Sequence, residues 1–590
     1  MKFHSKIILN LVNKGGNKLF FRNHKDYSSL LIKACKYKKT KLAKLLVKLG
    51  ANVNEQDIYG DIPLMAAFRN KNIELVQFLI KQNADLNKTD LNGDTALILA
   101  CKYWNEDIIK WLLSKNPDIN KSNLYGDTPL ILACKNKNEN IVKILLNISN
   151  IDVNKINKNG NTALIFACKN KSTSIVKMLL ENNYIDINTA NINGDTALIA
   201  ACKNNSIDIV QMLLKRKNIN VNKINECADT ALIISLKNKN EYLAQMLLKQ
   251  KNIDIHKINK DGNTAFTVAC DNGLINLIRQ LLEKGSYINH LNKYKNTALM
   301  IACSKNNIDL VKFLLSYKNI NVNISNIDSN TALMIACFKN CEEIVQLLLN
   351  KNANINSENK FGDTAVTIAC NKSNENIIKL LLDNGANVNK SNNNGNNPLI
   401  LACNRNNSNI IKLLLDHNTN LSKAQKNIAL VLACSNGNVE IVKLLLEKNA
   451  NINVKGKDGD TPLSIAYYNG HENILKLLIE NFADLNKLDN DVRKGVVNIL
   501  LKNIDPKIET IIDIQNAFLV KDPIWVENSL FKYYKSCTNN IIKNVHNLRE
   551  IKYYVSNKVQ EINDPQKNKE MLRVVSSFSQ KIANFSPSLN

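Results

Sequence analysis

The sequence predicts an all-α fold in which pairs of short helices stack into a solenoid and β-hairpin turns project from it. Three observations predict this fold. One phrase, NGDTALIAACKN at 193–204, recurs along most of the 590-residue chain. Its copies follow one another at 33 or 34 residues, with a single step of 31. Each copy combines turn residues with two apolar stretches of helical spacing, which is typical of repeats that bury a core only against their neighbours.

The front of each copy has the signals of a turn and a helix start. In the phrase, Gly194 and Asp195 precede Thr196, whose hydroxyl suits a helix N-cap, and proline follows the threonine in some copies. We therefore expect a first helix over 197–203. The polar break NNSID then leads into a second helix with apolar residues at helical spacing, and Asn-rich residues lead to the next turn.

The cysteine of the phrase marks one register position through fourteen copies, which span residues 26–487. We call it the marker position. It is occupied by Cys35, Phe68, Cys101, Cys134, Cys168, Cys202, Leu236, Cys270, Cys303, Cys337, Cys370, Cys403, Cys434 and Tyr467. The step of 31 residues before Cys434 has no turn glycine, so a truncated hairpin is expected there. That hairpin is either a notch in a binding surface or a weak joint.

Three further segments flank the repeats. We expect residues 1–25 to form an N-terminal cap, because terminal repeats need polar outer faces. Residues 488–502 read as a degenerate capping repeat that retains only a second helix. The period is lost over 503–590, where three prolines and a helix-spaced apolar stripe predict a helical C-terminal region. This region is either a cap folded onto the last repeats or a separate recruitment module.

The succession of turn, helix, break and helix at this period resembles the ankyrin repeat. The family's Thr-Pro-Leu-His-x-Ala phrase is matched at 128–133 and 461–466, except that the histidine is replaced throughout. The family's Gly-Ala-Asp-Val-Asn ending is closely matched at 50–54 and 385–389. The resemblance covers almost four-fifths of the chain. It implies paired antiparallel helices, projecting hairpins, and a concave binding surface lined by hairpin tips and the ends of the inner helices.

The cysteines of the marker position are expected to be buried rather than bridged or metal-bound, whereas Cys227, Cys341 and Cys537 lie outside this register and are less constrained. Successive markers should lie roughly 10 Å apart, whereas a disulfide needs Cα atoms within about 7 Å. Cys-x-x-Cys pairs, which would indicate zinc, do not occur. Free cysteine behaves as a small hydrophobe. Unbridged thiols favour a reducing compartment, which is the cytoplasm or the nucleus.

The sequence does not favour an enzyme or a membrane-spanning protein. Its seven histidines form no metal-binding array, and it has neither a phosphate-binding glycine loop nor a serine nucleophile elbow. Recurring turn aspartates such as Asp94, Asp127 and Asp195 are interpreted as bonding local backbone. No run approaches the roughly 18–20 apolar residues that span a bilayer. We expect no catalytic residues, no cofactor and no metal.

The residue after each marker supplies the main candidate binding surface. Seven consecutive copies have a basic residue there, and the series stops at Asp271. It is either a basic ladder for an acidic helix or extended acidic segment, or a pattern inherited by repeat duplication. We call it the basic row; it consists of Lys36, Arg69, Lys102, Lys135, Lys169, Lys203 and Lys237.

Aromatic residues extend this candidate surface. Tyr103 and Trp104 follow the basic row in one copy, and Trp104 alternatively packs against the next repeat. Tyr and Trp are common interface anchors. Four further aromatic residues stand at predicted hairpin tips: Tyr59, Tyr125, Tyr294 and Phe361.

The resulting expectation is a non-enzymatic, monomeric scaffold or adaptor that binds protein partners, including acidic segments. The net charge of +26 leaves a polyanion binder, of nucleic acid or anionic membrane, as one alternative. Nucleic acid is less favoured, because aromatic stacking partners do not alternate with the basic row. Another alternative is a ubiquitin-ligase substrate adaptor or effector that uses 503–590 for recruitment.

Overall fold

The computed structural model describes residues 24–58, 60–103, 106–417, 421–456 and 458–501, together with 512–513, 569, 572–574 and 576. The chain divides into two compact units, Met1–Ala298 and Leu299–Asn590. The N-terminal cap expected over 1–25 lies outside the described residues, apart from the first residues of α2. The helical region expected over 503–590 lies outside them except for a few isolated positions.

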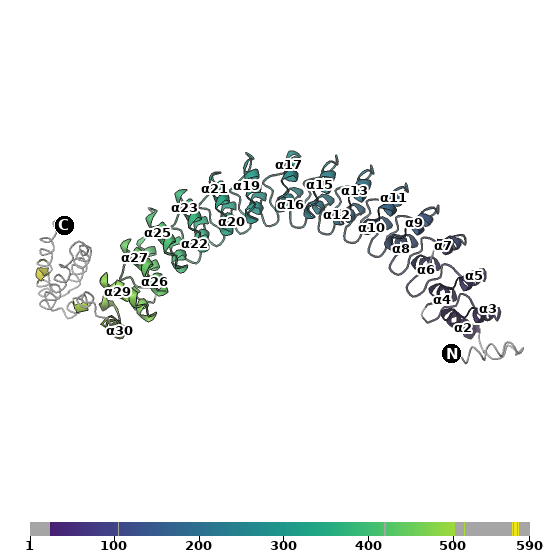
Figure 1. Cartoon of the computed structure of the whole chain (residues 1–590), viewed down its shortest axis with the longest axis horizontal. Helices are drawn as coiled ribbons and strands as arrows, with labels where there is room; N and C mark the ends of the chain where they lie inside the picture. Colours follow the sequence, from purple (N-terminus) through teal and green to yellow (C-terminus); the bar gives the residue numbers. More distant parts are fainter. Residues whose placement is uncertain are drawn as a thin grey trace. The chain divides into compact units, whose positions relative to one another are not determined.

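The first unit consists of helix pairs (Figure 1). Even-numbered helices pack against one another in one layer, and odd-numbered helices form a second layer beside them. Its helices are α2 (His24–Lys36), α3 (Thr40–Lys48), α4 (Pro63–Arg69), α5 (Ile73–Lys81), α6 (Ala96–Tyr103), α7 (Glu106–Leu113), α8 (Pro129–Lys135), α9 (Glu139–Leu146), α10 (Ala163–Lys169), α11 (Thr173–Leu180), α12 (Ala197–Lys203), α13 (Ile207–Leu214), α14 (Ala231–Lys237), α15 (Glu241–Leu248), α16 (Ala265–Asp271) and α17 (Ile275–Glu283).

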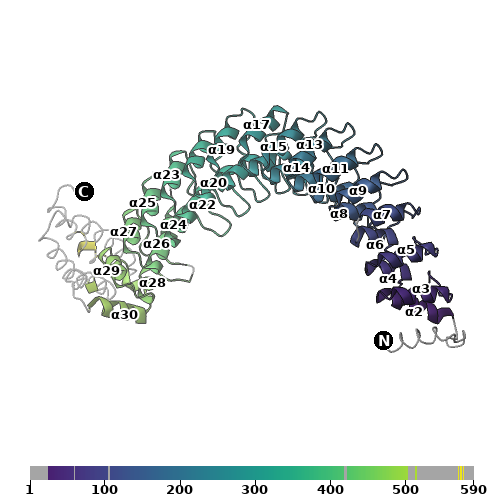
Figure 2. The ribbon, with the colours of Figure 1, turned by 45° about the vertical axis from the view of Figure 1, so that its right-hand side comes forward.

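The second unit has the same two-layer plan, seen from another side in Figure 2. Helix α30, the last element of the continuously described part of this unit, packs on both α28 and α29. Its elements are α18 (Ala298–Ser304), which begins at the boundary, α19 (Ile308–Leu315), α20 (Ala332–Lys339), α21 (Glu342–Leu349), α22 (Ala365–Lys372), α23 (Glu375–Asp383), α24 (Pro398–Asn404), α25 (Ser408–Asp416), α26 (Lys423–Asn436), α27 (Val439–Glu447), α28 (Pro462–Tyr468), α29 (Glu472–Glu480), the 3-10 turn η2 (Leu485–Lys487) and α30 (Asn490–Leu501).

The first helix of the opening phrase is α12, which covers the residues that the sequence predicts. Thr196 is its N-cap, and the threonine hydroxyl accepts a hydrogen bond from the backbone N–H of Ile199 at 3.3 Å. This bond satisfies one of the N–H groups that a helix start leaves without an intrahelical partner. The same cap recurs at Thr128, Thr162, Thr230, Thr264, Thr331, Thr364 and Thr461.

The marker cysteines lie in the core, as expected for small buried hydrophobes. All of them are buried, free thiols. Burial disfavours the thiolate and raises the pKa of Cys35, Cys101 and Cys202 from an ordinary value of 9.0 to about 12. These thiols are therefore protonated and weakly reactive at neutral pH. Cys227 differs, because it lies exposed at a hairpin tip.

One Asx residue organises most of the hairpin turns. In the phrase, the side-chain Oδ1 of Asn191 accepts from the N–H groups of Asn193 at 3.0 Å and Asp195 at 2.9 Å. Gly194 has a φ of +72°, and a Cβ there would lie 2.7 Å from the Cα of Asn225 in the next repeat. Glycine is therefore needed both for its left-handed backbone and for the close approach. The turn anchors are Asp57, Asp90, Asn123, Asn157, Asn191, Asn225, Asn259, Asn292, Asn326, Asn359 and Asn392.

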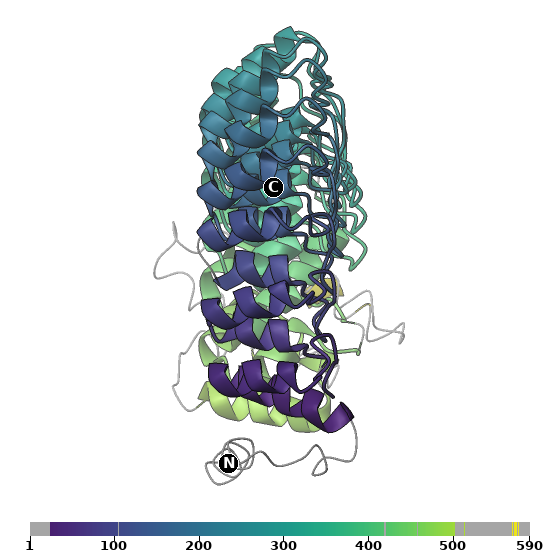
Figure 3. The same ribbon diagram turned by 90° about the vertical axis from the view of Figure 1, so that its right-hand side faces the viewer.

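Successive hairpins are linked by backbone hydrogen bonds. The N–H of Leu124 donates to the carbonyl of Asn92 at 2.8 Å, and the N–H of Lys158 donates to that of Tyr125 at 2.9 Å. Within the first unit the hairpins all lie along one side of the helices (Figure 3). The described residues contain isolated antiparallel bridges, such as that between Ile224 and Thr230, but no longer strand.

A second asparagine position joins repeats through the loops that follow the second helices. The Oδ1 of Asn154 accepts from the N–H of Asp186 at 2.8 Å, and its Nδ2 donates to the carbonyl of Tyr184 at 2.7 Å. One side-chain amide thus satisfies two backbone groups of the next repeat. The same pair of bonds is made by Asn54, Asn120, Asn188, Asn222 and Asn356.

The copy after the 31-residue step replaces the hairpin by helix. Here α26 has 14 residues and begins at Lys423, well before the position at which other first helices start. Ser422 and Gln425 form a capping box at its N-terminus. The side chain of Gln425 also donates to the carbonyl of Asn389 at 2.8 Å, which ties this helix to the preceding repeat. The residues that would form the hairpin tip are therefore part of a helix.

Candidate functional site

Most members of the basic row reach back to the turn of their own repeat. The Nζ of Lys102 lies 2.5 Å from Asp94, eight residues earlier, and Asp94 is almost wholly buried while Lys102 is 23% exposed. The carboxylate of Asp94 also accepts from the Nδ2 of Asn123 at 3.0 Å. The same pairing joins Lys135 to Asp127 at 3.3 Å, Lys203 to Asp195 at 2.7 Å and Lys237 to Asp229 at 2.6 Å. The turn aspartates thus bind lysine side chains, while the anchor residue bonds the local backbone.

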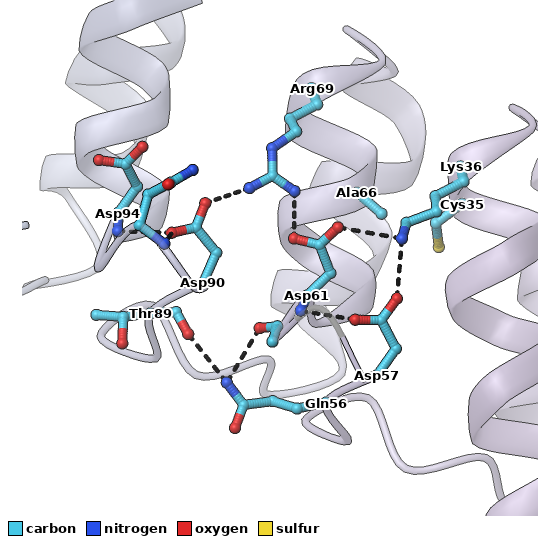
Figure 4. Close-up of polar contacts among 12 residues, drawn as sticks. Cys35, Lys36, Gln56, Asp57, Asp61, Ala66, Arg69, Thr89, Asp90 and Asp94 are labelled. Atoms are coloured by element: carbon cyan, nitrogen blue, oxygen red, sulfur yellow. Dashed lines mark hydrogen bonds and ion pairs between the residues drawn. The ribbon is translucent and has the colours of Figure 1, made fainter. Parts of the chain in front are cut away.

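The first two members of the basic row share a chain of carboxylates (Figure 4). Lys36 donates to Asp57 at 2.8 Å and lies 3.2 Å from Asp61, and Arg69 bridges Asp61 and Asp90. Burial lowers the pKa of Lys36 and of Arg69. Their hydrogen bonds and charge interactions with these aspartates outweigh that effect, and both pKa values lie above the ordinary ones. The two cations are therefore held tightly within the first repeats.

Lys169 is the exception in the row, because its turn partner is an amide. Its Nζ donates to the Oδ1 of Asn161 at 2.9 Å. Burial lowers the pKa of Lys169, the charge of Lys203 lowers it further, and the charge of Asp195 opposes both. Lys169 therefore lacks the ion pair that its neighbours Lys135 and Lys203 make.

The end of the row follows the loss of the turn carboxylate. In the copy after Lys237 the turn residue is Asn263 and the row residue is Asp271; the next two copies pair asparagine with Ser304 and with Phe338. The three copies after Lys237 thus combine an asparagine in the turn with a non-basic row residue, whereas the earlier copy with Asn161 in its turn retains Lys169. The eight-residue spacing between aspartate and lysine was visible in the sequence, but sequence reasoning did not use it.

Hairpin tips expose the aromatic residues that the sequence singled out. Tyr125, Tyr294 and Phe361 are exposed at their tips, and Tyr103 is exposed at the end of α6. Tyr59 and Trp104 lie outside the described residues. The structure also exposes aliphatic residues directly after the turn anchors, which sequence reasoning missed. In the first unit these are Ile58, Leu91, Leu124 and Ile192.

The histidines of the adjacent repeats contact neighbouring groups rather than each other. The Nε2 of His290 lies 2.8 Å from the carbonyl of Gly262, and the ring of His256 lies 5.0 Å from that of Tyr287. No group of three potential metal ligands occurs among the described residues. None of the described helices has the length and apolar character needed to cross a bilayer.

The comparisons with known proteins concern the whole repeat region. A family model described as ankyrin repeats, in three copies, matches residues 2–90, 64–157, 148–225, 219–292, 286–359, 351–425 and 417–489. These overlapping matches follow one another from residue 2 to residue 489. No curated protein matches the sequence.

Proposed function

Because the chain belongs to the ankyrin-repeat family, we propose that it is a non-enzymatic scaffold that binds protein partners through its hairpin tips and first-helix ends. The observation that carries this proposal is the display of apolar side chains on consecutive tips. Leu91 is 61% exposed and Tyr125 is 64% exposed, and both occupy hairpins that are hydrogen-bonded to the next hairpin. Exposed apolar residues that lie together on a rigid surface are typical of interaction sites.

The rigidity of the tips supports binding at low entropic cost. Each tip is fixed by its turn anchor and by a backbone hydrogen bond to the neighbouring hairpin. The backbone of the tips is therefore already ordered before association. Binding avoids the entropic cost of ordering a flexible loop. The tyrosine and leucine side chains supply the apolar area, and the paired lysines and aspartates beside them supply a polar rim.

The basic row contributes to this proposal as a rim rather than as a strip of free charge. Buried aspartates compensate Lys102, Lys135, Lys203 and Lys237, which reduces the attraction that these lysines exert on a distant anion. Lys169, whose partner is neutral, is the member best suited to contact an acidic partner. This pairing favours a protein partner over a polyanion for the first unit.

The proposed scaffold acts as a monomer in the cytoplasm or the nucleus. The buried, unbridged thiols of the marker position support a reducing compartment. A role as ubiquitin-ligase adaptor or effector would require residues 503–590 to recruit a second protein. Affinity capture with the full chain and with a chain ending at residue 502 separates the two cases, because a recruitment module loses a partner on truncation.

Affinity capture also tests the surface. The full-length protein with Leu91→Ser and Tyr125→Ser should lose its specific partners, because both changes remove apolar contact area without touching the core. The matched control carries Tyr184→Ser and Tyr242→Ser, two changes at exposed tyrosines outside the hairpins. Quantitative mass spectrometry should show at least a roughly tenfold loss for the tip variant and none for the control. Equal capture by the two variants would refute the tip surface.

A further inference from the structure

Basic residues reappear in the second unit, shifted by one register position. In the first unit the second residue after the marker is often an asparagine whose Nδ2 donates to a carbonyl at the end of the preceding first helix, as Asn204 does to Lys169 at 2.8 Å. Four consecutive copies at the start of the second unit have a basic residue instead. They are Lys305, Lys339, Lys372 and Arg405, and all four are exposed.

The last three of these cations lie at the C-terminal ends of α20, α22 and α24, and α22 packs against both of the other helices. The Nζ of Lys372 lies 4.0 Å from the ring centroid of Phe338, in the neighbouring copy. The Nη2 of Arg405 donates to the Oδ1 of Asn371 at 2.6 Å, which joins the next pair of copies. Lys339 directly follows Phe338 at the end of α20. We call Phe338, Lys339, Lys372 and Arg405 the cationic strip.

The cationic strip differs from the basic row in its charge balance. No ion pair joins Lys339, Lys372 or Arg405 to any carboxylate among the described residues, whereas six of the seven members of the row have one. The turn residue that pairs with lysine in the first unit is asparagine in two of the three copies that carry these cations. The strip therefore retains uncompensated positive charge.

The acidic residues nearest in sequence to the strip already have partners. Asp363, the remaining turn aspartate, accepts from the Nδ2 of Asn392 at 2.8 Å. Glu342, in the first turn of α21, accepts from Asn376 at 3.1 Å. Glu375, in the corresponding position of α23, accepts from the Nδ2 of Asn409 at 3.1 Å, and Glu343 pairs with Lys312 at 2.6 Å. Among the described residues none of these carboxylates is paired with Lys339, Lys372 or Arg405, so a ligand carboxylate does not have to displace an existing ion pair.

A structural role for the strip would be electrostatic stabilisation of helix ends. Lys339 and Lys372 are the last residues of α20 and α22, where the helix dipole favours positive charge. Such a role requires neither exposure of Phe338 nor the recurrence of cations at the spacing of the repeats. It also predicts that neutral substitutions change stability without changing the binding of any ligand.

Building on the proposed function of protein binding, we infer that the cationic strip binds an acidic polypeptide segment in the polyproline II conformation, with a carboxylate at every third residue. This helix has three residues per turn and rises about 3.1 Å per residue, so every third side chain lies on one face about 9 Å apart. Packed helices of successive repeats lie roughly 8–10 Å apart, which matches that spacing.

Other anionic ligands match the strip less well. In a β-strand, side chains on one face lie roughly 6.6 Å apart, which falls short of the repeat spacing. Single-stranded nucleic acid needs several aromatic residues on which bases stack. The strip has one, Phe338, and Lys372 lies over its ring. The exposed part of that ring instead offers an apolar surface for prolines between the carboxylates, as in other polyproline recognition sites.

The test uses a labelled peptide and the full-length protein. The probe is a ten-residue peptide of three Glu-Pro-Pro units and a final Glu, and the comparison peptide has the same composition with its glutamates contiguous. Fluorescence anisotropy should give the register-matched peptide at least about fivefold higher affinity. The double variant Lys339→Gln and Lys372→Gln should weaken its binding about tenfold, and Phe338→Ser should weaken it as well.

The matched control changes the same net charge elsewhere in the second unit. Lys318→Gln and Lys351→Gln alter two exposed lysines in the loops that follow α19 and α21, and they should leave affinity within about twofold. Equal effects of the two double variants, equal affinities of the two peptides, or tighter strip-dependent binding of a single-stranded oligonucleotide would each overturn the inference. Suppose that the register-matched peptide fails to bind although the variant with Leu91→Ser and Tyr125→Ser loses its protein partners. That combination would overturn this inference alone and leave the proposed function standing.

Discussion

Replacing Lys102 by methionine tests whether the basic row acts as a series of internal ion pairs. Methionine keeps much of the side-chain length and removes the charge. The substitution leaves the carboxylate of Asp94, which is 3% exposed, with the amide of Asn123 as its remaining side-chain partner. Breaking an exposed pair costs roughly 0–1 kcal/mol and breaking a wholly buried pair about 3–5 kcal/mol. With one partner buried and the other partly exposed, we expect a loss of about 2 kcal/mol.

The reciprocal change, Asp94→Asn, should cost less. Asn161 occupies the equivalent position in a later copy and accepts a hydrogen bond from Lys169, so an amide fits this turn. We expect a loss of about 1 kcal/mol, because an ion pair is replaced by a hydrogen bond from the same ammonium to a neutral amide. The double variant carries no buried charge. Its loss should therefore fall short of the sum of the single losses by about 1 kcal/mol or more.

Hydrogen exchange of the full-length chain measures these losses where they arise. Stability in a repeat array is a sum of local and nearest-neighbour contributions, so the effect should concentrate in peptides that cover 90–135. Peptides from α24 and α25 serve as an internal control. If the stability loss of the double variant equals the sum of the two single losses to within about 0.3–0.5 kcal/mol, the two side chains are not coupled. That result would refute the interpretation of the row as internal pairs.

Three further predictions concern the buried thiols and the turns. Burial raises the pKa of Cys101 from 9.0 to about 12, so its contribution to the free energy of unfolding is complete below about pH 9 and declines as pH rises towards 12. Thermal melts across that range should show a shallower decline for Cys101→Ala. Native protein at neutral pH should react rapidly with a thiol reagent at exposed Cys227 and slowly at buried Cys101, and equal labelling rates in peptide maps would contradict the burial. Gly194→Ala should destabilise more than Gly285→Ala, because both glycines have positive φ but only the first would bring a Cβ against the next hairpin, and equal hydrogen-exchange losses would contradict this.

The regular parts of the fold were predictable because the capping and turn residues of each copy agree with the period of the repeat. In the sequence, Thr196 predicts the N-cap of α12, and the polar residues after Lys203 predict the end of this helix. The helical replacement of one hairpin was harder, although Ser422 and Gln425 have the spacing of a capping box. The expectation of a turn at this position came from comparison with the neighbouring copies. The structure instead has the helix that the local capping signal indicates.

The candidate surface was less predictable because exposure and pairing depend on contacts between copies. A lysine that follows the marker looks the same in sequence whether it faces solvent or a buried carboxylate. Only the folded turn brings Asp94 to Lys102. Similarly, Ile192 looks in sequence like any other apolar residue of a repeat. It is exposed because it lies at a hairpin tip, which projects beyond the helices.

The two asparagine positions explain why the two residues after the marker can differ in charge from copy to copy. Asn191 fixes a turn from within, and Asn154 links its own repeat to the backbone of the next. Both act through backbone groups that every copy possesses, so neither depends on the residues that follow the marker. Substitution there leaves the bonds of both asparagine positions in place, although replacing an asparagine such as Asn204 removes its own bond to the preceding helix. The first unit can therefore use its cations in internal pairs, while the second exposes Lys339 and Lys372 on the same scaffold.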